Sequence, residues 1–183
     1  MPGDHLALYL SLLPAMYFSL FLHEAGHAVL GWWCGYEVTS FGLGLDRPLF
    51  LVRWRGTRVY FSLTRSTQGI TWLIAPMMYP PRYRQILMLL GGCLANGVAA
   101  LTALLFRLLL PWGSDVWLVL LGWNAWIGLR NLVPFQMRLG KFSLRSDGAK
   151  VWQLLCRGHL PSHVEESIRT FTAMRPFWEG VFV

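Results

Sequence analysis

The stretch FLHEAGHAVLGWW, residues 21–33, places two histidines and a glutamate at the end of a long apolar run. The residues before it, from about Leu6 onward, are almost all apolar. Ionisable side chains within such a run are expensive to bury in lipid and usually mark function. This stretch therefore predicts a membrane-spanning helix that carries a functional site near one end.

The whole chain has the composition of a membrane protein. Of its 183 residues, 55% are hydrophobic and only 14% are charged. Three segments approach or reach the roughly 20 apolar residues that cross a bilayer: about 6–33, 86–110 and 116–133. The first segment has no Lys or Arg ahead of it and no small-residue cleavage site, so we expect it to be retained rather than removed as a signal peptide. We predict one mainly α membrane domain over residues 1–183.

Charge distribution predicts the orientation in the membrane. Residues 35–85 and the tail after Arg130 are rich in Lys and Arg, whereas the N-terminus and the turn near residues 111–115 have none. By the positive-inside rule, the N-terminus and this turn lie outside, and the C-terminal tail lies in the cytoplasm. A bacterial cytoplasmic membrane fits this pattern. The net charge of +7 then indicates topology and contact with lipid headgroups, and no nucleic-acid partner is expected.

The segment between the first two spans has strand character. Residues 36–65 are rich in β-branched and aromatic residues, and Arg55-Gly56-Thr57 offers a turn, which predicts a small cytoplasmic hairpin. The stretch from Thr71 to Pro80 is apolar but short, so we expect it to dip into the interface or line a cavity rather than cross the membrane.

The cytoplasmic tail, residues 134–183, predicts two amphipathic helices. Ser146-Asp147-Gly148 opens the first, whose apolar face comprises Val151, Leu154 and Leu155. A capping box over residues 162–165 opens the second.

The motif His23-Glu24-Ala25-Gly26-His27 fits the pattern H-E-x-x-H. On a helix, residues four apart lie on one face, so both imidazoles can bind one metal ion. Zinc polarises a carbonyl and acidifies bound water, and a neighbouring carboxylate takes the proton and passes it to the leaving amine. The motif predicts Zn²⁺ bound by His23 and His27, with Glu24 as the general base.

A catalytic zinc site needs a third protein ligand and one open position. Four groups on the predicted cytoplasmic side could supply it, namely Asp46, Asp147, His159 and His163. Pro161 interrupts any helix that would align the two histidines. Asp147 precedes a glycine, which lets backbone approach closely.

The order of three motifs resembles that of the site-2 protease family of intramembrane zinc metalloproteases. HEAGH lies in the first span, GGCLANG at 91–97 in the second, and NLVP at 131–134 with SDG at 146–148 follow the third. The resemblance implies that His23, His27 and Asp147 bind zinc and that Glu24 is the base. In the compact form of the family the aspartate follows the Asn and Pro within a few residues, whereas here FQMRLGKFSLRS intervenes.

The resemblance also implies substrate contacts. Asn96, in the stretch that begins at Gly92, would help hold the substrate backbone, and Asn131 with Pro134 would shape the bend before the aspartate. Small residues of the second motif also predict a close helix-packing face, formed by Gly91, Gly92, Ala95 and Gly97. In mid-membrane Asn96 needs a partner, which is either a neighbouring helix or a substrate strand.

These features predict a zinc endopeptidase that cleaves membrane-associated or membrane-spanning proteins near the cytoplasmic face. An extended substrate segment could pair with a sheet edge, which we expect in the hairpin at residues 52–63. Two alternatives stay open. One is a membrane-anchored zincin that acts on soluble polypeptides, with Asp46 as third ligand; the other is a non-catalytic membrane interaction protein.

Overall fold

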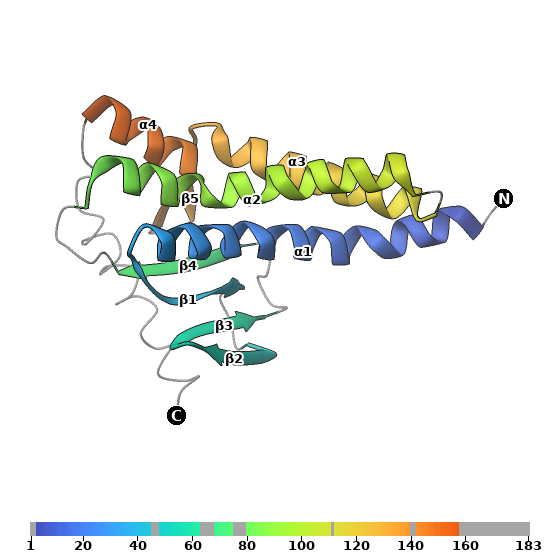
Figure 1. The fold of residues 1–183 in the computed structure, drawn as a ribbon, viewed down its shortest axis with the longest axis horizontal. Coiled ribbons are helices and arrows are strands. Elements are labelled where there is room, and N and C mark those ends of the chain that lie inside the picture. Colours follow the sequence, from blue (N-terminus) through green and yellow to red (C-terminus); the bar gives the residue numbers. More distant parts are fainter. Residues whose placement is uncertain are drawn as a thin grey trace.

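A computed structural model describes residues 3–44, 48–62, 68–74, 80–110, 112–139 and 142–157. Three long helices lie side by side: α1 (Gly3–Trp33), α2 (Arg82–Leu109) and α3 (Ser114–Leu132). A small sheet lies along one side of α1, and α4 (Asp147–Arg157) contacts α2 and α3 (Figure 1). The fold is thus a three-helix bundle with a β-sheet on one flank.

The three helices occupy the segments that the sequence predicted as spans. α2 begins at Arg82, directly after Pro80 and Pro81, because the residue before a proline is disfavoured in a helix. Among the described residues, α2 is the one helix long and apolar enough to cross a membrane, with a mean hydropathy of 1.9 over its best window. That α1, α2 and α3 cross the membrane together stays a prediction.

The flanking sheet is larger than the predicted hairpin. Its strands are β1 (Glu37–Leu43), β2 (Phe50–Trp54), β3 (Thr57–Phe61) and β4 (Gly69–Ile74), in the order β2-β3-β1-β4. β2 and β3 form an antiparallel hairpin. Arg55 and Gly56 turn it with φ of 50° and 84°, the positive values that a tight hairpin turn requires. The predicted turn is confirmed, while the parallel pairing of β1 with β3 was not foreseen.

β4 accounts for part of the segment from Thr71 to Pro80, of which residues 75–79 lie outside the described residues. Residues up to Ile74 pair antiparallel with β1 and form an edge strand of the sheet as described. The apolar, β-branched composition that suggested an interfacial segment is equally that of a half-buried strand.

Aromatic side chains attach the sheet to α1. Phe41 of β1 lies between Phe21 and Trp32, with ring centroids 5.7 and 6.3 Å away, and Tyr17 contacts Phe61 at 5.7 Å. These contacts begin at Tyr17 and end at Trp32, so the sheet follows the C-terminal half of α1. The histidines lie on this half.

The segment between Pro134 and Asp147 is not an open connection. β5 (Gln136–Leu139) and β6 (Phe142–Arg145) pair as an antiparallel hairpin that returns the chain to its starting point. Ser146 N donates to Phe135 O at 3.0 Å. Ser146 Oγ also accepts from Phe135 N at 3.0 Å and donates to Val133 O at 2.7 Å. We call these three hydrogen bonds the Ser146 clamp.

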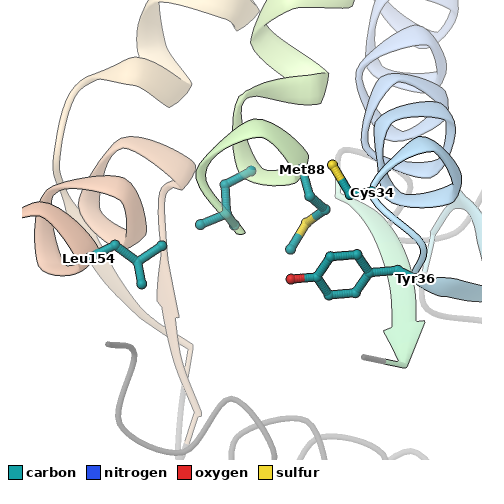
Figure 2. Packing of buried hydrophobic residues seen from close by; sticks show 5 residues of the cluster. Cys34, Tyr36, Met88 and Leu154 are labelled. Atoms are coloured by element: carbon teal, nitrogen blue, oxygen red, sulfur yellow. The ribbon is translucent and has the colours of Figure 1, made fainter. Parts of the chain in front are cut away.

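α4 confirms the first predicted tail helix. Leu154 is fully buried and belongs to a cluster that also contains Cys34, Tyr36, Met88 and Leu89 (Figure 2). Val151 packs against this cluster, whereas Leu155 is 54% exposed, so the buried face is narrower than predicted. The second predicted tail helix, from Ser162 onward, lies outside the described residues.

Candidate metal centre

His23 and His27 share one buried face of α1, at the contact with α2. Their side chains are almost inaccessible, and their Nε2 atoms lie 3.3 Å apart. Glycines create this contact, because a Cβ on Gly26 would collide with the backbone oxygen of Gly91. The predicted close packing of small residues is confirmed for Gly91, whereas Gly97 has open space around it.

Each imidazole is oriented through its Nδ1 atom. His27 Nδ1 lies 2.9 Å from Met88 O, and a carbonyl only accepts, so this nitrogen carries the proton. His23 Nδ1 lies 2.7 Å from Asn96 Oδ1, the acceptor end of that amide. In the neutral rings both Nε2 atoms are therefore unprotonated and carry lone pairs that converge.

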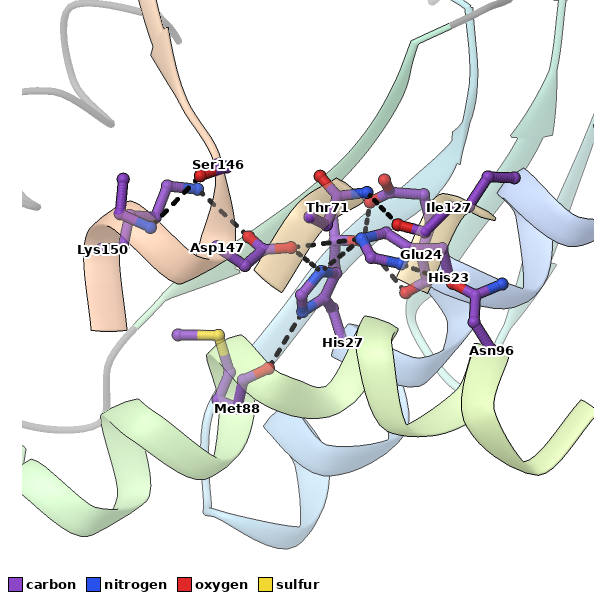
Figure 3. Close-up of polar contacts among 12 residues, drawn as sticks. His23, Glu24, His27, Thr71, Met88, Asn96, Ile127, Ser146, Asp147 and Lys150 are labelled. Atoms are coloured by element: carbon purple, nitrogen blue, oxygen red, sulfur yellow. Dashed lines mark hydrogen bonds and ion pairs between the residues drawn. The ribbon is translucent and has the colours of Figure 1, made fainter. Parts of the chain in front are cut away.

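Asp147 completes the cluster from the start of α4. Its Oδ2 lies 3.1 Å from the Nε2 atoms of both His23 and His27 (Figure 3). Three convergent acceptors repel one another unless a cation lies between them. Ligands about 2.0–2.2 Å from zinc at the corners of a tetrahedron lie about 3.3–3.6 Å apart, close to the separations here. The nitrogen and oxygen donors fit zinc.

The Ser146 clamp determines where Asp147 lies. It joins the chain after β6 to the chain before β5, so Asp147 follows the end of α3 in space although a hairpin intervenes in sequence. Gly148 permits this approach, because a Cβ there would collide with Leu132 O. The predicted need for glycine after the aspartate is thus explained by packing against α3.

The carboxyl of Asp147 is held in its charged form. Burial opposes that charge, but when the imidazoles carry a proton on Nε2, attraction to His27, hydrogen bonds from both imidazoles and the nearby Lys150 ammonium outweigh it. Lys150 Nζ lies 3.6 Å from Asp147 Oδ1. Together they hold the pKa of the Asp147 carboxyl well below its usual 3.8, as suits an anionic metal ligand.

Glu24 is buried beside His23 and faces β4 (Figure 3). Thr71 Oγ1 lies 2.6 Å from Glu24 Oε2 and 3.0 Å from Glu24 O, so these two acceptors share one hydroxyl proton. The Glu24 carboxylate also packs on Gly69, where a Cβ would lie 2.6 Å from Glu24 Cδ. The sequence offered no signal for Thr71, because its role depends on β4 lying against α1.

The substrate contact predicted for Asn96 stays a prediction, and the structure gives this side chain partners within the bundle. It is fully buried, its Oδ1 faces His23, and its Nδ2 donates to Ser19 O at 2.9 Å and to Asn124 Oδ1 at 2.8 Å. Both ends of the amide are therefore bonded within the bundle. The alternative partner, a neighbouring helix, is the one that the structure provides.

Gly92 and Asn131 also have close neighbours within the bundle, and their predicted substrate contacts stay predictions. A Cβ on Gly92 would lie 2.5 Å from His23 Cε1 and 2.6 Å from His27 Nε2, so this glycine makes room for the imidazoles. Asn131 Nδ2 donates at 3.0 Å to the carbonyl of Ile127 in its own helix. We therefore read Gly92 as part of the metal centre and Asn131 as part of the end of α3.

The other proposed third ligands cannot be compared with Asp147. Asp46, His159 and His163 lie outside the described residues. Within the described part of the chain, His23, His27 and Asp147 form a buried group able to hold a metal ion.

Two histidines one helical turn apart, an adjacent glutamate and an aspartate from a later segment form a group that could hold a metal ion, as a metallopeptidase requires. The family model of peptidase family M50 matches residues 11–175, so the chain belongs to this family. Its members are membrane-associated metallopeptidases, and the match confirms the resemblance to site-2 proteases. No curated protein matches the chain.

Proposed function

We propose that the chain is an intramembrane zinc endopeptidase that hydrolyses peptide bonds of membrane-spanning or membrane-associated proteins near the cytoplasmic face. The observation that carries this proposal is the convergence of His23 Nε2, His27 Nε2 and Asp147 Oδ2, with buried Glu24 beside them. Membership of a metallopeptidase family supports the reaction class.

His23, His27 and Asp147 would hold Zn²⁺ and leave one position open. Zinc in such a site acidifies water and polarises a carbonyl. Glu24 takes the proton of the attacking water and transfers it to the leaving amine. Thr71 holds Glu24 Oε2, which leaves the other carboxylate oxygen available for this proton.

Burial favours this proposal over an open, membrane-anchored zincin. His23, Glu24, His27 and Asp147 are each at most 8% exposed, and helices and the sheet surround them. An enzyme acting on soluble polypeptides would need a more open site. We propose that α1 and α3 cross the membrane together with α2, which sets the site within the bilayer near its cytoplasmic side.

We propose that the substrate binds in extended form along β4. A transmembrane helix hides its amides in hydrogen bonds, so cleavage requires local unwinding, and an edge strand offers new partners for the freed amides. The sequence suggested the β2–β3 hairpin for this edge. β4 fits better, because it is also an edge strand and its Thr71 touches the base.

Proline substitutions separate the two edges. Val52→Pro in β2 should leave cleavage of a membrane substrate unchanged, whereas Ile70→Pro or Leu73→Pro in β4 should reduce it. Zinc content reports whether each variant keeps its metal centre. Equal loss of cleavage from Val52→Pro with zinc retained would return the docking edge to the hairpin.

Glu24→Gln tests the proposed reaction. The variant keeps the side-chain volume but cannot accept the proton, so purified protein should bind one zinc per chain and lose about 10²–10⁴-fold in turnover of a membrane substrate. Unchanged processing by zinc-loaded Glu24→Gln would favour the non-catalytic alternative. Faster cleavage of soluble peptides than of membrane substrates by the wild type would favour the anchored zincin.

A further inference from the structure

A row of buried polar side chains joins the three long helices behind His23. Ser19 on α1, Asn96 on α2 and Asn124 on α3 are each at most 1% exposed. Proton abstraction and metal binding as proposed above use none of them directly. Polar groups this deep in an apolar bundle destabilise it unless they are hydrogen-bonded, so their arrangement calls for a specific explanation.

The direction of each hydrogen bond in this row is fixed by its acceptors. Ser19 Oγ donates to Ala15 O at 2.7 Å, and Asn124 Nδ2 donates to Ser19 Oγ and to Leu120 O, both at 2.8 Å. Backbone carbonyls only accept, so they fix the direction of each bond. The amide nitrogen of Asn124 must face these acceptors, which leaves its Oδ1 facing α2.

The orientation of Asn124 in turn fixes the orientation of the Asn96 amide, and Asn96 fixes which nitrogen of His23 carries the proton. Asn96 Nδ2 faces two acceptors, Asn124 Oδ1 at 2.8 Å and Ser19 O at 2.9 Å. Asn96 Oδ1 therefore faces His23 Nδ1, 2.7 Å away, and accepts its proton. A proton on Nδ1 leaves Nε2 as the lone-pair atom directed at His27 and Asp147.

We propose that Asn124, together with Ser19, is a positioning residue for the metal centre. It acts through Asn96 to fix the tautomer and ring orientation of His23, and neither residue touches the metal. This inference rests on the proposed zinc site, and it adds that zinc affinity depends on the packing of α3 against α1 and α2. Removing the hydrogen-bond partner of a metal-binding histidine typically weakens metal affinity about 10–100-fold.

Asn124→Leu tests the proposal, because it keeps approximate volume but removes the acceptor that orients Asn96. Competition against a chromophoric chelator, on the full chain in detergent, should show zinc affinity about tenfold weaker, the lower end of that range. Ser19→Ala should weaken zinc less than Asn124→Leu.

Matched controls separate positioning from general loss of stability. Val119→Ala removes buried apolar volume from the same helix, and Thr102→Val removes a hydroxyl bonded only to its own helix. Both should keep wild-type zinc affinity. If Val119→Ala weakens zinc as much as Asn124→Leu, the proposal is wrong.

A measurement without metal gives an independent result. In zinc-free protein with ¹⁵N-labelled histidine, at a pH where imidazole is neutral, His23 should carry its proton on Nδ1, and Asn124→Leu should show a mixture of tautomers. The same tautomer in both would overturn the proposal, including where the leucine variant binds zinc poorly. A wild type that binds zinc but cleaves nothing would instead refute the proposed function and leave this inference standing.

Discussion

The two sides of the metal centre are built differently. On the helix side, α2 contacts His23 and His27 through Asn96, Met88 O and Gly92, and α3 contacts Asn96 through Asn124. On the sheet side, β4 contacts Glu24 through Thr71 and Gly69. The difference indicates that metal binding and proton transfer depend on separate parts of the fold. Substitutions on each side should therefore affect separate properties.

The largest effect is expected from removing the third ligand. Asp147→Ala should strip or greatly weaken zinc and abolish hydrolysis, because two imidazoles leave the metal under-coordinated. Zinc stoichiometry of the purified variant measures this. Asp115→Ala, which removes an acidic residue from the opposite end of α3, serves as the control and should keep zinc. Full zinc in Asp147→Ala would mean that Asp147 only stabilises the first turn of α4, a role worth about 0.3–1 kcal/mol.

A smaller but still severe effect is expected from filling the space beside the imidazoles. Gly92→Ala puts a methyl group 2.5 Å from His23 Cε1, so the histidines must shift and zinc affinity should fall at least tenfold. Gly97→Ala is the matched control on the same helix, because nothing lies within 4 Å of its Cβ. It should stabilise the helix by about 0.5–1 kcal/mol and leave zinc unchanged. Equal zinc affinity in the two variants would contradict the close approach at Gly92.

The smallest effect is expected on the sheet side. Thr71→Val keeps the shape but removes the hydroxyl bonded to Glu24, a charge-assisted bond of about 1.5 kcal/mol, so turnover should fall about tenfold. Zinc affinity should stay at the wild-type value, and Thr71→Ser should restore most of the turnover. Loss of zinc in Thr71→Val would show that the two sides are coupled, and the distinction between them would fail.

Part of the fold and of the candidate site follows from local sequence patterns, and part depends on tertiary packing. The three helices and the pair His23 and His27 follow from apolar run length and i, i+4 spacing, both of which are local. The contact of Thr71 with Glu24 depends on which strand packs against α1, and the Asn96–Asn124 contact depends on which faces of α2 and α3 meet. No local sequence pattern carries that information. Asn96 illustrates the limit: its burial was predictable, but the choice between a substrate and a neighbouring helix required the position of Asn124.

Asp147 shows a different limit. Its place in the chain suggested a long connection, because the pairing of β5 with β6 and the clamp at Ser146 are needed to see that the connection closes on itself. The motif resemblance identified the residue correctly as a member of the convergent group, but it offered no reason for the added length.

The closed hairpin has a practical consequence for handling the protein. Since Phe135 and Ser146 are hydrogen-bonded to each other, β5 leaves the bundle and β6 returns to the same place. The hydrogen bonds of Ser146 therefore fix the position of Asp147 independently of the length and sequence of the hairpin. Residues 136–145 are therefore the place to shorten the chain or to insert an epitope or a fluorescent label. Unchanged zinc content would show that the metal centre is undisturbed.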